Sequence, residues 1–183
     1  MGNNRLRFLY LSHLSKPSSD RLVYRTIRQR RIRTIVELGI GLCCRARRMI
    51  EVAAMSGSAD RVAYVGVDPF EARSLTDGPG LPLRMAHRLL ANTGARIRLV
   101  PGDAFTALAR AANDLRGIDL IVVSACQDAD SLARAWYYLP RMLHEGSLVL
   151  AEENLPSGGT RFRQVSVVEI AGLAADAAPR RAA

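Results

Sequence analysis

The segment over residues 34–41, Thr-Ile-Val-Glu-Leu-Gly-Ile-Gly, constrains the fold more than any other part of the chain. A β-branched run contains an acidic residue, Glu37, and is followed by Gly39 and Gly41, and then by a helical stretch from residue 43 to about residue 55. Glycine at such a turn adopts positive φ and lets a ligand lie against the main chain. A strand, a glycine turn and a helix in this order are typical of a doubly wound sheet that presents backbone N–H groups to a nucleotide-like ligand.

Apolar, β-branched runs recur along the chain and alternate with segments of helical spacing. The runs cover residues 34–38, 62–67, 97–100, 119–125, 147–151 and 162–170. Strands that alternate with helices predict a doubly wound α/β fold, with a mostly parallel sheet and helices on both faces. The first four runs are almost continuously apolar, as expected when both faces of the sheet are covered. The last run follows the fifth too closely for a helical crossover, so we expect an antiparallel C-terminal edge strand.

The length of 183 residues suits one domain with a full core. Within it we expect a basic helical segment over residues 1–33 that packs on the core, a Rossmann-like ligand-binding domain over 34–171, and a frayed tail over 172–183. Three acidic residues are expected to cap helices. They are Asp20, before a helix that runs to about Arg31, Asp103 and Asp130.

The net charge of +9 is concentrated in the first quarter of the chain. Residues 1–48 hold twelve basic and two acidic side chains, whereas the remainder holds 14 basic and 15 acidic ones. Arg21, Arg25 and Arg28 share one face of the expected N-terminal helix. This asymmetry points either to an anionic partner such as RNA or to an arginine-rich surface that is only solvated.

Cysteine content and hydropathy favour a cytoplasmic protein. Cys43, Cys44 and Cys126 form no Cys-x-x-Cys or Cys/His cluster, so we expect reduced thiols and no metal site. Apolar runs are too short for a membrane span, and residues 8–11 are too few for a signal sequence. We therefore expect no membrane partner, and the sequence leaves the oligomeric state open, a dimer included.

A set of mostly glycine and polar residues stands at or just after the ends of the first five runs, where an open parallel sheet binds its ligands. They are Glu37, Gly39 and Gly41 at the first, Asp68 and Pro69 at the second, Gly102, Asp103 and Ala104 at the third, Ser124 at the fourth, and Glu152 and Glu153 at the fifth. A carboxylate at the position of Asp68 can accept hydrogen bonds from both hydroxyls of a ribose, or it can form a turn before Pro69. Asp103 can hold an adenine amino group, cap the next helix, or do both.

This pattern resembles the class I S-adenosylmethionine-dependent methyltransferases from about residue 30 to residue 153. The resemblance implies that the glycine loop passes under the methionine part of S-adenosylmethionine and that Glu37 anchors the loop and the amino group. It also implies that Asp68 binds the ribose. The implied cofactor-binding residues are Glu37, Gly39, Gly41, Asp68, Pro69, Gly102, Asp103 and Ala104, the last two flanking the adenine, together with Ser124.

The chain departs from the family pattern at three places. Cys43 stands where the family's loop usually has a third glycine, which adds bulk near the cofactor. Ser124 stands where metal-dependent catechol-type members carry a metal-ligating aspartate, which disfavours that subclass. The C-terminal part has room for one strand rather than a helix and a strand pair. The acceptor site is therefore open, or it is completed by the N-terminal segment or by another subunit.

The resemblance implies an enzyme that transfers the sulfonium methyl group to an acceptor, with a small molecule slightly favoured over RNA. A second class of function stays open, a non-catalytic module that binds S-adenosylmethionine or nucleic acid, because no residue can be named as a general base. NAD is the competing cofactor. The NAD-binding fingerprint is Gly-x-Gly-x-x-Gly, and this chain has Cys44 where the fingerprint requires the third glycine.

Overall fold

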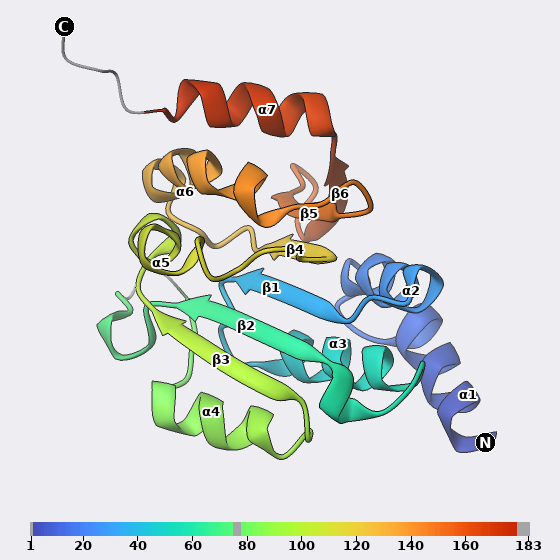
Figure 1. Cartoon of the computed structure of the whole chain (residues 1–183). Coiled ribbons are helices and arrows are strands. Elements are labelled where there is room, and N and C mark those ends of the chain that lie inside the picture. The colour runs from blue at the N-terminus through green and yellow to red at the C-terminus, as the bar shows by residue number, and fades with distance from the viewer. Residues whose placement is uncertain (1, 75–77, 179–183) are drawn as a thin grey trace, which may run out of the picture.

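Six strands form one sheet in the order β3-β2-β1-β4-β5-β6 (Figure 1). The computed structural model describes residues 2–74 and 78–178. The strands are β1 (Thr34–Leu38), β2 (Ala63–Asp68), β3 (Arg96–Pro101), β4 (Leu120–Val123), β5 (Leu148–Asn154) and β6 (Thr160–Val165). Strands β1 to β5 pair in parallel, and β6 pairs antiparallel with β5. The predicted doubly wound sheet with an antiparallel C-terminal edge is therefore confirmed.

Helices cover both faces of this sheet (Figure 1). They are α1 (Gly2–Leu9), α2 (Asp20–Arg30), α3 (Cys44–Ala54), α4 (Leu83–Ala91), α5 (Ala104–Ala111), α6 (Ala129–Ala135) and α7 (Val167–Asp176), with the π-helical turn η1 (Tyr10–Leu14) and the 3₁₀ turns η2 (Ala59–Arg61), η3 (Phe70–Ala72) and η5 (Trp136–Met142). Successive strand residues point to opposite faces. Ile35 thus packs in the core beneath α2, α3 and α4, whereas Val36 packs in the core beneath α5, η5 and α7.

The sheet order places β3 at an edge, which corrects the expectation that this strand is covered on both faces. Arg96 and Arg98 are exposed, and only Val100 is buried among the residues of β3. Ile97 and Leu99 pack on the side that α4 covers, whereas on the other face Val100 packs with the residues of α5 and the two arginines stay exposed.

The C-terminal segment differs from the sequence expectation of a strand over residues 162–170. Strand β6 ends at Val165, and the hydroxyl of Ser166 accepts a hydrogen bond of 3.1 Å from the backbone N–H of Glu169. This Ser-x-x-Glu pattern starts α7, which packs through Ile170. Residues 172–176, expected to fray, belong to α7, and residues 179–183 lie outside the described part of the chain.

Two of the three expected helix caps are wrong. Asp103 caps α5, because its carboxylate accepts hydrogen bonds from the backbone N–H groups of Phe105 and Thr106. Asp128, not Asp130, caps α6. Asp20 is the first residue of α2 and is buried, and its carboxylate accepts a hydrogen bond from the Tyr24 hydroxyl instead of from the helix backbone.

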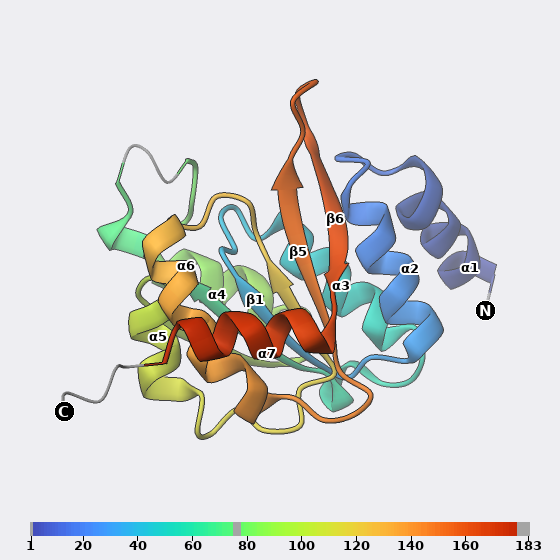
Figure 2. The same cartoon turned by 90° about the horizontal axis from the view of Figure 1, so that it is seen from above.

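Helix α2 lies beside the β5–β6 hairpin, which extends beyond the rest of the sheet (Figure 2). The hydroxyl of Thr160 in β6 lies 3.0 Å from the hydroxyl of Ser19, just before α2, within hydrogen-bond distance. The N-terminal segment is thereby brought to the carboxyl end of the sheet. Across the described ranges, none of the helices is both long and apolar enough to span a bilayer.

Candidate functional site

The glycine loop after β1 requires glycine at two positions. Gly39 has φ of +87° and Gly41 has φ of +51°, both in the region that side chains disfavour. A Cβ atom on Gly39 would overlap Nε2 of Gln127 and would lie 3.0 Å from Cβ of Ser124. The absent side chain therefore allows the loop after β4 to lie directly against the main chain of the glycine loop.

Cys43 also has a left-handed backbone, with φ of +60°, directly before α3. This conformation is the one expected at a third loop glycine. The thiol is buried and packs in the core cluster that includes Ile40 and Met49. Burial raises the pKa of the Cys43 thiol to about 12, so the group stays protonated.

Asp68 lies at the end of β2 with a fully buried carboxylate. Its Oδ2 accepts a hydrogen bond of 3.0 Å from the N–H of Gly41, and its Oδ1 accepts one of 3.0 Å from the N–H of Phe70. A third donor is the guanidinium of Arg73, which forms an ion pair with Oδ2. Sequence reasoning found Asp68 but missed Arg73.

Glu37 is fully buried at the end of β1. Its Oε1 lies 2.7 Å from Nε of Arg45, and its Oε2 accepts a hydrogen bond from the Tyr64 hydroxyl. Burial raises the pKa of the Glu37 carboxyl, and the positive charge of Arg45 opposes that rise. Both carboxylate oxygens are thus engaged by side chains of the protein.

Arg45 also pairs with two further carboxylates. Its Nη1 lies 2.9 Å from Oε2 of Glu152 and 3.5 Å from Oδ1 of Asp20. Glu152 additionally accepts hydrogen bonds from the hydroxyls of Thr160, at 2.7 Å, and Ser124, at 3.2 Å. The predicted strand-end residues Glu37, Ser124 and Glu152 therefore belong to one polar cluster that links α2, α3 and the sheet.

A cavity of about 280 Å³ opens at Pro69, the residue that follows Asp68. It is lined by Pro69, Ala72, Arg73, Gly102, Asp103, Cys126, Gln127 and Asp128. Three of the residues that sequence reasoning selected are thus brought together here. Partial burial opposes ionisation of Asp103, but hydrogen bonds from Ser131 and Thr106 outweigh it and lower the pKa of Asp103 to about 2.

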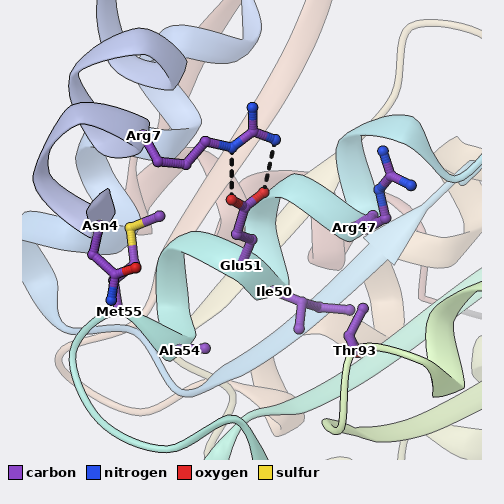
Figure 3. Close-up of a pocket in the computed structure, with 8 residues that line it drawn as sticks. All are labelled: Asn4, Arg7, Arg47, Ile50, Glu51, Ala54, Met55 and Thr93. Atoms are coloured by element: carbon purple, nitrogen blue, oxygen red, sulfur yellow. Dashed lines mark hydrogen bonds and ion pairs between the residues drawn. The ribbon is translucent and has the colours of Figure 1, made fainter.

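A separate cleft of about 420 Å³ lies between α1, α3 and the residues after α4 (Figure 3). Its lining residues are Asn4, Arg7, Arg47, Ile50, Glu51, Ala54, Met55 and Thr93. Arg7 spans it to form two hydrogen bonds with Glu51, at 2.7 and 3.1 Å. None of the residues described there belongs to the predicted cofactor set, so we place the candidate site at the strand ends.

The arginines of the predicted RNA face differ in their surroundings. Arg21 donates a hydrogen bond of 2.9 Å to the carbonyl of Ser15, and Arg28 donates one of 2.6 Å to the hydroxyl of Ser56. Arg25 is exposed. All three cysteines are free thiols, and in the described ranges no group of three or more histidine, cysteine or acidic side chains could hold a metal ion.

No protein-family model matches the chain, and no curated protein matches it. Solved structures do match it. The O-methyltransferase TomG from Streptomyces achromogenes, in complex with S-adenosylmethionine, has a TM-score of 0.55 at 15% identity, over 76% of this chain and 56% of that one. The O-methyltransferase from Bacillus cereus, in complex with S-adenosylhomocysteine, has a TM-score of 0.52 at 15% identity, over 82% and 66%. An O-methyltransferase family protein from Burkholderia thailandensis has a TM-score of 0.52 at 15% identity, over 95% and 53%.

These similarities define the class to which the fold belongs, the Rossmann-like fold of class I S-adenosylmethionine-dependent methyltransferases. The chain spans between 53% and 66% of the length of the three structures. At this level of identity the likeness concerns the fold, and chemistry has to be argued from the site itself.

Proposed function

We propose that the protein binds S-adenosylmethionine at the carboxyl ends of β1, β2 and β3 and transfers its methyl group to a small-molecule acceptor. The observation that carries the proposal is the position of Asp68. A buried carboxylate at the end of β2 holds the glycine loop through Gly41 and directly precedes Pro69, which lines a cavity with Gly102 and Asp103. An acid at this place of a doubly wound sheet is the group that binds a ribose diol.

The residues fit the adenosine half of the cofactor. Asp68 would hold the ribose, and the cavity walls formed by Pro69, Gly102 and Asp103 would enclose the adenine, with Ala104 at the start of α5 beside them. Hydrogen bonds within the protein hold the Asp103 carboxylate rigidly in place. Because the Thr106 N–H and the Ser131 hydroxyl also donate to it, the acceptor positions of Asp103 are largely used within the protein, so Asp103 would shape the wall of the adenine pocket rather than bind the amino group of the base.

The methionine half would lie against the glycine loop. Gly39 lacks the Cβ that would meet Ser124 and Gln127, so a ligand can reach its backbone once the Gln127 side chain turns aside. Glu37 would act through its pairing with Arg45, which fixes α3 against β1 below this loop. We assign Glu37 an anchoring role, because both of its oxygens are engaged within the protein.

The cofactor supplies an activated methyl group on a sulfonium ion. The protein then has to align the acceptor with that methyl group, and alignment alone contributes several kcal/mol to such a displacement. A small-molecule acceptor is favoured because the solved structures described above as similar to this chain are O-methyltransferases, one of them involved in tomaymycin synthesis. The alternative is a non-catalytic module that binds the cofactor or a nucleic acid.

Calorimetric titration with S-adenosylmethionine, S-adenosylhomocysteine and NAD tests the proposal. We expect binding of the first two compounds and no heat of binding with NAD, because Cys44 replaces the third glycine of the NAD fingerprint. Binding of NAD alone, or of none of the three by a folded protein, would overturn it. Transfer of a labelled methyl group to candidate acceptors then separates an enzyme from a binding module.

A further inference from the structure

The ion pair between Arg73 and Asp68 occupies the atom that a cofactor ribose would need. The Arg73 side chain is 10% exposed and that of Asp68 is not exposed at all. The pair is therefore largely shielded from water, where an ion pair is stronger than at a surface. Arg73 lies in the segment after η3, five residues beyond Asp68.

The Asp68 carboxylate has too few free acceptor positions for both a ribose diol and Arg73. An ionised carboxylate offers about four acceptor positions on its two oxygens. Three donors already occupy Asp68: the N–H groups of Gly41 and Phe70, and the guanidinium of Arg73. A ribose diol offers two donors, so both cannot be accepted while Arg73 is in place. The two backbone N–H groups shape the glycine loop and the turn after β2, which leaves Arg73 as the donor to be displaced.

Arg73 lies between two open spaces, so its side chain has room for a second conformation. Arg73 is the one described residue that lines both the cavity of about 280 Å³ at Pro69 and an open hollow of about 750 Å³ beside it. The described lining of the hollow is Phe70, Arg73, Ser74, Gly78, Pro79, Gly80, Leu81 and Pro82. A turn of the side chain toward this hollow would release Asp68 without moving the strand.

We propose that Arg73 competes with the cofactor ribose for Asp68 and so sets the affinity for the cofactor. This inference rests on the proposed function. Cofactor binding exchanges one set of hydrogen bonds on Asp68 for another, and the observed affinity is lowered by the fraction of molecules in which Arg73 holds the carboxylate. Removal of the guanidinium therefore raises affinity, whereas removal of a residue that contacts the cofactor would lower it.

The first test compares wild type, Arg73→Gln and the matched control Arg84→Gln by calorimetric titration with S-adenosylhomocysteine. Arg84 is an exposed arginine of α4. We expect Arg73→Gln to bind several-fold more tightly, on the order of tenfold if Arg73 holds Asp68 nine-tenths of the time, and Arg84→Gln to bind like wild type. Equal or weaker binding by a folded Arg73→Gln variant would overturn the role of Arg73.

A second variant, Gly80→Ala, disturbs the ion pair between Arg73 and Asp68 without changing either residue. A Cβ atom on Gly80 would overlap Nε of Arg73 and lie 2.9 Å from its Cδ, and Gly80 has no positive φ that would strain an alanine. Because this overlap reaches Nε, Gly80→Ala cannot keep the Arg73 guanidinium in its present position on Asp68, although the added methyl group also narrows the hollow. If this weakens the ion pair, the variant should also bind S-adenosylhomocysteine more tightly. Gly172→Ala, where no atom lies within 4 Å of the added Cβ, is the control.

The combined results separate the two proposals. If wild type binds S-adenosylhomocysteine but neither Arg73→Gln nor Gly80→Ala binds more tightly, the competition is refuted and the proposed function stands. If Arg73→Gln does not fold, Gly80→Ala decides the question. Failure of wild type and all folded variants to bind refutes the cofactor assignment and the competition together. Binding by the variants alone would show that Arg73 is the dominant barrier.

Discussion

The Nε atom of Arg45 lies 2.7 Å from Oε1 of Glu37, and both side chains are largely or fully buried. Because Arg45 lies in the first turn of α3 and Glu37 is the penultimate residue of β1, this contact fixes the glycine loop between them at both of its ends. The same guanidinium pairs with Glu152 of β5 and Asp20 of α2. One arginine thus joins four elements around the strand ends.

We predict that Arg45→Met destabilises the protein by roughly 3–5 kcal/mol, because the substitution leaves the buried carboxylate of Glu37 without its counter-charge. Urea unfolding of wild type and variant measures the loss. The same substitution in a Glu37→Gln background should cost less, since no buried charge is then left at that position. A loss below about 1 kcal/mol in the single variant would show that the pair is not buried as described.

The charge of Asp103 should stabilise the fold only above its folded pKa. That pKa is lowered to about 2, below the usual value of 3.8, so the unfolded chain binds more protons than the native state between these values. Stability from the charge is therefore present above about pH 4 and is lost as the pH falls toward 2. Asp103→Asn keeps the cap but not the charge. Its difference from wild type in unfolding free energy should shrink over this pH range, and a constant difference would contradict the assignment.

Substitutions of Cys43 test two separate effects, the strain of its left-handed backbone and any contact of its side chain with the cofactor. Because its φ is +60°, we expect Cys43→Gly to be more stable than Cys43→Ala by about 1 kcal/mol, since alanine keeps the left-handed strain. The thiol packs in the core, so affinity for S-adenosylhomocysteine should be unchanged or improved in Cys43→Gly. Thermal unfolding and calorimetry check the two parts. A strong loss of affinity would reveal a role for the thiol in the site.

RNA binding by the basic N-terminal segment is tested by filter binding at several salt concentrations. We expect no retention of RNA at physiological salt, because Arg21 and Arg28 are engaged by Ser15 and Ser56. If RNA does bind, replacing Arg21, Arg25 and Arg28 with glutamine should flatten the salt dependence by about one unit per lost phosphate contact. Such a result would favour a nucleic-acid acceptor over a small molecule.

The sequence was sufficient for the sheet and for the positions of the strand-end residues, since both follow from local patterns. A β-branched run followed by Asp68, or by Gly102 and Asp103, identifies a strand and its end without any tertiary information. The C-terminal helix was not predicted because Val165, Val167 and Val168 favour a strand, although the pattern Ser166-x-x-Glu169 signals a helix start.

The partners of the charged residues could not be predicted. A carboxylate within an apolar strand, such as Glu37, needs a counter-charge when buried, but the sequence does not say which arginine supplies it. Arg45 and Glu152 are 107 positions apart and meet only through the fold. Arg73 follows Asp68 in an aperiodic segment, where spacing carries no information about side-chain direction.

The most direct test of the account is the affinity of Asp68→Ala for S-adenosylhomocysteine, measured by calorimetry beside wild type. Removing the carboxylate that would bind the ribose should weaken binding by roughly 1.5–3 kcal/mol, the range for hydrogen bonds to a charged group. Circular dichroism establishes that the variant is folded. Wild-type affinity in a folded Asp68→Ala variant would contradict the account, because the cofactor would then bind without the residue on which the site is built.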